Sequence, residues 1–118
     1  MMAASGTFGS GEEYVDFFDI NALGGLVTKT ITLRPREGNP PPRLVETSAG
    51  LLNAIGLENN GLEDFIEKKM PFLRKLKIPV VVSISGAEPG EFVEVAELLS
   101  EFPVDGLELN ISCPNLKT

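Results

Sequence analysis

The segment Pro79–Ile84, Pro-Val-Val-Val-Ser-Ile, constrains the fold of this 118-residue chain more than any other part of it. Its successive valines break the alternation of apolar and polar residues that is typical of a strand with one face in water. A strand buried on both faces belongs to a parallel sheet covered by helices, and parallel strands need long crossover connections. The segment therefore predicts an α/β fold built on a parallel sheet.

Strand and helix patterns alternate along the rest of the chain, as such a sheet requires. Apolar residues recur at helical spacing over Leu62–Leu76 and Glu88–Phe102, and Pro71 is expected to kink or restart the first of these helices. A shorter helix is predicted over Glu12–Phe18. The predicted strands are Met1–Ala4, Leu26–Ile31, Pro79–Ile84 and Gly106–Ile111.

A long excursion over Arg34–Asn60 interrupts this alternation and is rich in proline and glycine. Because proline removes ladder donors, we expect a loop with at most a short hairpin, of which Leu44–Thr47 would be one arm. A loop of this length inside a compact domain is usually functional or disordered. The sequence stops soon after its fourth predicted strand, so we expect residues 1–118 to be part of a larger β/α domain.

Composition excludes several classes of function. The net charge of -7 makes nucleic acid a poor partner, because phosphate binding needs clustered lysine and arginine. No apolar run reaches the roughly 18 residues of a membrane-spanning helix. The absence of histidine excludes histidine-based acid–base catalysis and histidine metal ligands within this sequence. The single cysteine fits a reducing compartment, so we expect a cytoplasmic protein, and no metal site is predicted.

Uncommon polar residues fall at or just beyond the carboxyl ends of the predicted strands. In β/α barrels and open α/β sheets this edge carries the ligand site. The residues are Ser5, Lys29, Ser83 or Ser85, and Asn110 with Cys113.

Each of these features also has a simpler structural interpretation. Lys29 is either an edge-strand lysine that keeps the sheet soluble or a fixed cation for a carboxylate or a cofactor. Cys113 is either a small buried apolar residue or, on a loop before proline, a general base or nucleophile. Gly6–Gly11 favours a tight turn over a phosphate loop, because no P-loop lysine follows. Asparagine amides near strand ends suit a planar heterocycle with C=O and N–H groups.

Five motifs occur in register along the chain: Ala4–Gly9, Val27–Lys29, Pro35–Arg43, Leu52–Leu57 and Glu108–Asn115. Together they closely resemble the catalytic subunits of class 1 dihydroorotate dehydrogenases, and most of all the NAD-linked class 1B branch. The resemblance covers the whole chain but only about the first half of that family's domain. It implies the first four β/α units of a TIM (β/α)8 barrel, and residues 1–118 alone would bind little or no FMN.

The resemblance also implies a role for each matching residue in the oxidation of dihydroorotate to orotate during pyrimidine biosynthesis. Cys113 would be the base that takes a proton from C5 while hydride leaves C6 for flavin N5. Class 1B members often carry asparagine near the flavin where this chain has Ser83. The cofactor FMN would contact Ser5, Lys29, Thr30, Ser83 and Asn110, and the substrate would contact Lys29, Asn53, Ala54, Ile55, Gly56, Leu57, Asn110 and Asn115.

The implied partner of a class 1B catalytic subunit is an iron–sulfur FAD subunit that passes electrons to NAD, in a homo-oligomer or heterotetramer. Two alternatives stay open. The chain would otherwise be a non-catalytic half-barrel association module, since a four-stranded part of a barrel leaves sheet edges and apolar faces exposed. A related flavin barrel acting on another pyrimidine is the third interpretation.

Overall fold

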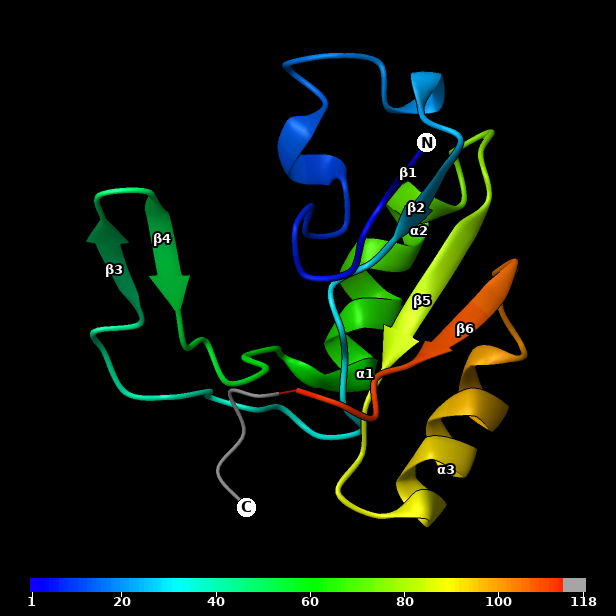
Figure 1. The fold of residues 1–118 in the computed structure, drawn as a ribbon. Helices are drawn as coiled ribbons and strands as arrows, with labels where there is room; N and C mark the ends of the chain where they lie inside the picture. The colour runs from blue at the N-terminus through cyan, green and yellow to red at the C-terminus, as the bar shows by residue number, and fades with distance from the viewer. Residues whose placement is uncertain (114–118) are drawn as a thin grey trace.

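A parallel sheet of four strands organises the chain in the computed structural model, which describes residues 1–113 (Figure 1). Each neighbouring pair of strands in this sheet is parallel. The predicted α/β fold with a parallel sheet is therefore confirmed. The strands lie in the order β1 (Met2–Ala3), β2 (Gly25–Val27), β5 (Val80–Ile84) and β6 (Gly106–Leu109).

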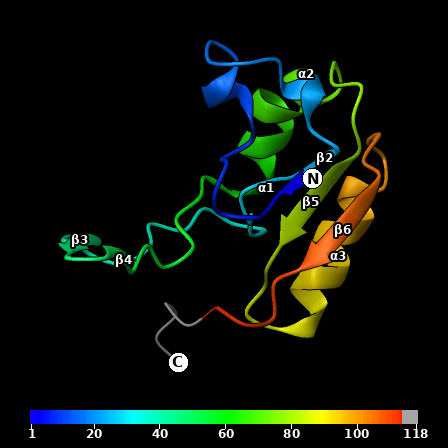
Figure 2. The same cartoon turned by 45° about the horizontal axis from the view of Figure 1, so that its top comes forward.

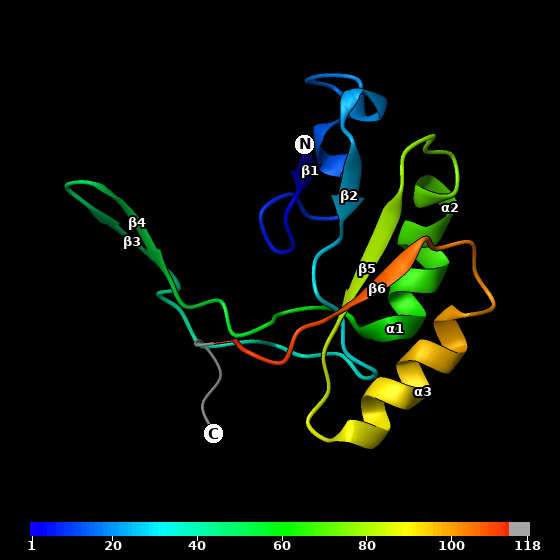
Figure 3. The ribbon, with the colours of Figure 1, turned by 45° about the vertical axis from the view of Figure 1, so that its right-hand side comes forward.

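Helical segments cover one face of this sheet. Three of them follow one another without a break: α1 (Gly61–Asp64), the π-helical turn η3 (Phe65–Lys69) and α2 (Met70–Leu73). Helix α3 (Pro89–Leu99) precedes β6. Figure 3 shows α1, α2 and α3 on the same side of β5 and β6. Within residues 1–113 no helix is long and apolar enough to cross a membrane.

The apolar core lies between the sheet and these helices, as strand alternation dictates. Val80, Val82 and Ile84 of β5 belong to the cluster that the helices cover. Successive strand residues point to opposite faces, so Ser83 lies on the face away from the helices. The buried cluster consists of Leu26, Ile31, Leu62, Phe65, Met70, Leu73, Val80, Val82, Ile84, Val95 and Leu99.

The prediction of a helix over Glu12–Phe18 is wrong. Only one turn of 3-10 helix forms there, η1 (Glu12–Tyr14), and a second, η2, spans Ile20–Ala22. The aromatic residues do not share a helix face. Instead, Phe8 stacks on Tyr14 with 4.1 Å between ring centroids.

The second strand is shorter than predicted, because one extra residue interrupts it. Val27 pairs with Val81, and Ile31 rejoins β5 through a bridge to Ile84. Residues 28–30 on one side therefore lie opposite residues 82–83 on the other, which makes a bulge. Lys29 lies in this bulge and not within a regular strand.

The helix predicted over Leu62–Leu76 forms from Gly61 to Leu73, and Pro71 restarts it as expected. The Met70 amide donates to the Phe65 carbonyl, which is the wide spacing of a π-turn. Pro71 then occupies the first turn of α2, where a missing amide hydrogen removes no helical bond.

The long excursion contains the expected hairpin, made of β3 (Leu44–Thr47) and β4 (Gly50–Asn53) in antiparallel pairing. The hairpin stands away from the central sheet, as Figures 1 and 2 show. All eight of its strand residues are exposed, and the side chains of Leu51 and Leu52 are 67% and 66% exposed. A two-stranded hairpin with this much apolar surface in water is only marginally stable by itself.

Candidate functional site

The carboxyl edge of the parallel sheet gathers most of the residues that the sequence placed at a ligand site. Because all four strands are parallel, the segments that follow them leave the sheet at one edge. Ser5 follows β1, Lys29 follows β2, Asn110 follows β6, and Cys113 lies four positions beyond the end of β6 at Leu109. Lys29, in the bulge that follows β2, and Cys113 therefore lie toward the same edge of the sheet.

Ser83 and Ser85 differ in their relation to this edge. Ser85 follows β5, whereas Ser83 lies within that strand and is fully buried. Ser85 Oγ donates to the backbone carbonyl of Asn110 at 3.2 Å, and the Asn110 amide donates to the Ile84 carbonyl at 2.9 Å. These bonds fix the backbone of Asn110 against the end of β5.

Three of the predicted cofactor residues form one hydrogen-bonded chain on the face away from the helices. Asn110 Nδ2 donates to Thr30 Oγ1 at 3.1 Å, and Thr30 Oγ1 lies 2.8 Å from Ser83 Oγ. The Thr30–Ser83 bond uses one of the two hydroxyl hydrogens, so the other can donate to a further acceptor. With Nδ2 directed at Thr30, Asn110 Oδ1 can accept a hydrogen. The chain thus offers both a donor and an acceptor to a polar ring.

The glycine-rich loop after β1 forms the tight turn that the sequence favoured. Gly6, Gly9 and Gly11 all have positive φ angles, and the Gly11 amide donates to the Phe8 carbonyl at 3.0 Å. Glu13 Oε2 accepts from the Ser10 amide at 3.2 Å. A carboxylate bonded to the backbone of this loop opposes anion binding there.

Lys29 and the glycine-rich loop line one pocket of about 340 Å³. The Lys29 amide donates to the Gly9 carbonyl at 2.7 Å, so the bulge residue and the loop are joined through their backbones. Asn59 and Lys69 line the same pocket. The pocket brings Lys29 together with groups that the sequence did not connect to it.

The predicted substrate segment, Asn53 to Leu57, leaves the hairpin and becomes progressively buried. Asn53 and Ala54 are exposed, Ile55 is half-buried, and Gly56 and Leu57 are buried. Its two last residues have positive φ angles, 77° and 57°.

The proline-rich arm before the hairpin holds this segment by its backbone. The Asn39 amide donates to the Ile55 carbonyl and Asn39 Nδ2 to the Ala54 carbonyl, both at 2.9 Å. Arg36 Nε donates to the Gly56 carbonyl at 3.2 Å. A side chain on Gly56 would meet Asn39 at 2.8 Å, so only glycine fits this contact.

Asn59 is a positioning residue that holds the end of the predicted substrate segment. Its Oδ1 accepts from the amides of Thr32 at 3.1 Å and Gly61 at 2.9 Å, and its Nδ2 donates to the Leu57 carbonyl at 2.8 Å. Asn60, at the N-cap position of α1, makes no side-chain cap. Asn59, and not its neighbour Asn60, therefore joins the start of α1 to Leu57.

The remaining predicted residues are less closely connected. Cys113 is half-buried and its thiol is free. Ser5 is half-buried in the loop after β1. Asn115 lies outside the described residues. Among residues 1–113 no cluster of three or more Cys, Asp or Glu side chains could hold a metal ion.

Comparison with known proteins gives consistent matches over the whole chain. The family model described as Dihydroorotate dehydrogenase matches residues 1–118. A protein of a Thermoanaerobacter species is 51% identical over 117 residues, and one of Pelobacter propionicus is 53% identical over 118 residues. Both carry the name dihydroorotate dehydrogenase B (NAD(+)), catalytic subunit, as does a protein of Geobacter sulfurreducens that is 51% identical. Each match covers 99% of this chain but 39% of the relative's length.

Proposed function

The chain belongs to the dihydroorotate dehydrogenase family, and from that premise we propose that the whole protein oxidises dihydroorotate to orotate in pyrimidine biosynthesis. Residues 1–118 would be the first four β/α units of its TIM barrel. The helices on one face of a parallel sheet and the polar carboxyl edge support this architecture.

We propose FMN as the cofactor, because the chain of Thr30, Ser83 and Asn110 fits a flavin ring. The isoalloxazine ring carries carbonyl oxygens and an N–H group. The spare hydroxyl hydrogen of the Thr30–Ser83 pair can donate to a carbonyl, and Asn110 Oδ1 can accept from the N–H. Ser5 and Lys29 would complete the contacts from the neighbouring strand ends. This hydrogen-bonded chain is the observation that most strongly supports the proposal.

In the proposed reaction this chain supplies the base and the groups that orient the substrate. Cys113 Sγ, as thiolate, would take the proton from C5 of dihydroorotate, which is acidified by the neighbouring carbonyl. When bound to the residues proposed above, FMN would supply the hydride acceptor for C6, and loss of the proton and the hydride leaves the C5–C6 double bond of orotate. Lys29 would neutralise negative charge at the site. Asn110, Asn115 and the segment Asn53 to Leu57 would hold the ring at short range.

We propose an iron–sulfur FAD subunit as the partner and NAD as the final electron acceptor. The relatives are named catalytic subunits of an NAD(+)-linked enzyme, which supports a second, electron-transferring subunit. The complete assembly would be a homo-oligomer or heterotetramer.

Substitution of the cysteine in the whole protein tests the assigned base. Cys113→Ala should nearly abolish dihydroorotate oxidation while the visible absorbance of bound FMN remains. Ser112→Ala is the matched control, because Ser112 is an exposed neighbour with no assigned role, and it should retain turnover. Full turnover by Cys113→Ala would refute the assignment of the base.

The exposed hairpin favours a second candidate function, association with another polypeptide. Four apolar side chains of the hairpin, Leu44, Val45, Leu51 and Leu52, are more than half exposed. Sedimentation of the isolated chain separates the possibilities, since a folded monomer argues against obligate pairing.

A further inference from the structure

The glycine-rich loop Gly6–Gly11 carries no regular strand or helix and depends on contacts from other segments for its position. Its three glycines have positive φ angles in the fold, and because glycine has no Cβ the unfolded loop has many alternative conformations. The loop follows Ser5 and contacts the Lys29 backbone, so its position affects two of the proposed FMN contacts.

Lys69 is the cation that ties this loop segment to the helical layer. Its ammonium group forms an ion pair with Glu12 and lies 3.8 Å from Glu13 Oε1. The Lys69 side chain is 29% exposed and that of Glu12 35% exposed, so the pair is less hydrated than a free surface pair. The hydrogen bond with Glu12 raises the pKa of Lys69, although partial burial acts in the opposite direction.

The two glutamates connect Lys69 to the glycine-rich loop. Glu12 and Glu13 form the first two residues of η1, directly after the loop. Glu13 Oε2 accepts from the Ser10 amide, and a Cβ on Gly9 would meet the same carboxylate at 2.7 Å. Gly9 is therefore packed against the Glu13 side chain that Lys69 faces.

Gly9 completes the connection to Lys29. Its carbonyl accepts from the Lys29 amide at 2.7 Å, in the bulge between β2 and Ile31. Lys29, Gly9, Glu13 and Lys69 also line the same pocket. A continuous set of contacts thus runs from the helical layer to the backbone of Lys29.

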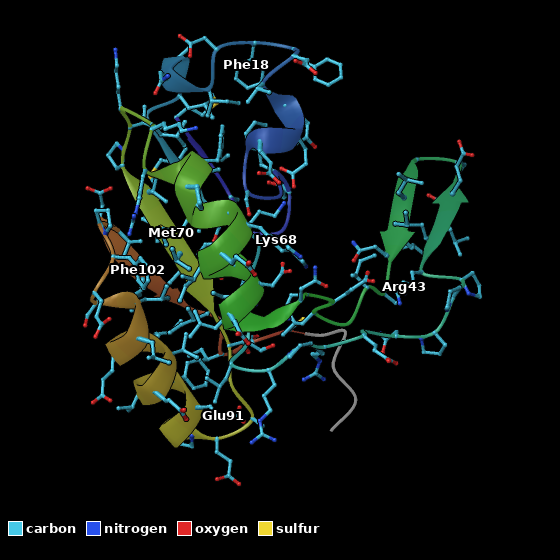
Figure 4. The ribbon with its side chains drawn as sticks, turned by 180° about the vertical axis from the view of Figure 1, so that it is seen from behind. Phe18, Arg43, Lys68, Met70, Glu91 and Phe102 are labelled. Carbon is cyan, nitrogen blue, oxygen red and sulfur yellow. The ribbon has the colours of Figure 1, made fainter. Side chains whose placement is uncertain are left out.

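The π-helical turn determines where Lys69 lies. Lys69 is the last residue of η3, immediately before the buried Met70 that begins α2. Figure 4 shows this helical segment beside the N-terminal segment, with Lys68 and Met70 labelled. The preceding residue, Lys68, pairs instead with Asp64 on its own helical segment.

We propose that Lys69 is a positioning residue for the cofactor site: through Glu12, Glu13 and Gly9 it holds the glycine-rich loop and the Lys29 backbone in place. This inference rests on the proposed function for its FMN readout. The contacts between Lys69, the two glutamates and the loop do not depend on the proposed function.

Hydrogen exchange and FMN affinity of the whole protein test the proposal together. In Lys69→Met, the amides of Ser10 and Lys29 should exchange about tenfold faster, equivalent to about 1.4 kcal/mol, with FMN affinity reduced by a similar factor. Exchange in β5 should stay unchanged. Lys69→Arg should restore both readouts. Lys68→Met is the matched control and should leave exchange at Ser10 and Lys29 and the FMN affinity at their wild-type values.

A second variant guards against misfolding of the first. Glu12→Gln with Glu13→Gln removes the same ion pairs from the partly exposed side and should produce the same local increase in exchange. Unchanged exchange at Ser10 and Lys29 in both variants would overturn the proposal, as would an equal increase throughout β5. If the whole protein binds no FMN but Lys69→Met still speeds amide exchange at Ser10 and Lys29, the proposed function is refuted while the role of Lys69 in holding the loop is supported.

Discussion

The Thr30–Ser83 hydroxyl pair on the proposed cofactor face can be tested by a double-mutant cycle. The two oxygens lie 2.8 Å apart, and the residues are 3% and 0% exposed. Thr30→Val removes one hydroxyl while nearly preserving the shape of the side chain, and Ser83→Ala removes the other. Thr30→Val leaves the buried Ser83 hydroxyl without this partner, and Ser83→Ala leaves the Thr30 hydroxyl bonded only to Asn110 Nδ2. Loss of a buried hydrogen bond of this kind destabilises a protein by about 1–3 kcal/mol.

The double variant should be less destabilised than the sum of the two single variants. Removing both hydroxyls leaves neither of them unpaired, so we expect a coupling energy of about 1 kcal/mol. Asn110 Nδ2 loses its acceptor whenever Thr30 is changed, but Asn110 is only half-buried and water can replace that bond. The Thr30 variant should therefore be only slightly worse than the Ser83 variant.

Urea unfolding of FMN-free protein, followed by circular dichroism, measures these free energies. Bound FMN must be absent because a ligand that binds only the folded state adds to its stability. Thr47→Val is a suitable control, since the Thr47 hydroxyl donates to the Gly50 carbonyl in the exposed hairpin and its loss should change stability by less than about 0.5 kcal/mol. Additive effects of Thr30→Val and Ser83→Ala, within about 0.5 kcal/mol, would refute the buried pair.

Three further predictions concern packing, backbone conformation and charge. Leu99→Ala should destabilise the protein by about 2–5 kcal/mol in urea unfolding, because Leu99 is fully buried, whereas the 43% exposed Leu98→Ala should have a much smaller effect. Gly56→Ala should weaken substrate affinity and stability together, since the new Cβ meets a neighbouring asparagine at 2.8 Å in a left-handed conformation; wild-type affinity and unfolding midpoint would contradict this. The hydrogen bond from Lys68 lowers the pKa of Asp64 below its usual 3.8, so this stabilising contribution is present at neutral pH and disappears as pH falls through the lowered pKa. Asp64→Asn should therefore flatten the acid side of the stability profile, and an unchanged profile would count against the pair.

The sequence predicted the elements whose signal is local. The valines of Pro79–Ile84 indicated a strand buried on both faces, and β5 forms there. The apolar spacing of Glu88–Phe102 indicated a helix, and α3 buries Val95 and Leu99. These patterns reflect only whether one or both faces of a helix or strand are buried. The apolar or polar type of each residue indicates that directly.

The sequence did not predict the features that depend on distant contacts. The bulge at residues 28–30 includes a backbone bond from Lys29 to the Gly9 carbonyl, twenty positions earlier in the chain. Glu12–Phe18 has helical spacing, but Tyr14 stacks on Phe8 and Phe18 packs against the same ring at a tilt. In both cases tertiary packing overrides the local pattern.

The candidate site was predictable in position but not in its contacts. Strand ends of a parallel sheet share one edge, so Lys29 and Asn110 could be assigned to a common edge from the strand pattern alone. The bonds of Thr30 to Ser83 and Asn110 span 53 and 80 positions in sequence and depend on the strand order. No local sequence pattern specifies the order of the strands in the sheet.

The hairpin that stands away from the sheet gives this protein a convenient place for a chemical label. Its tip, residues 48–49, is exposed and joins two exposed strands. A fluorescent dye attached through Ser48→Cys, with Cys113 replaced so that it does not react, would sit far from the buried cluster, so unfolding of the labelled and unlabelled protein should coincide. Its emission would then report when another polypeptide approaches the apolar strands beside it.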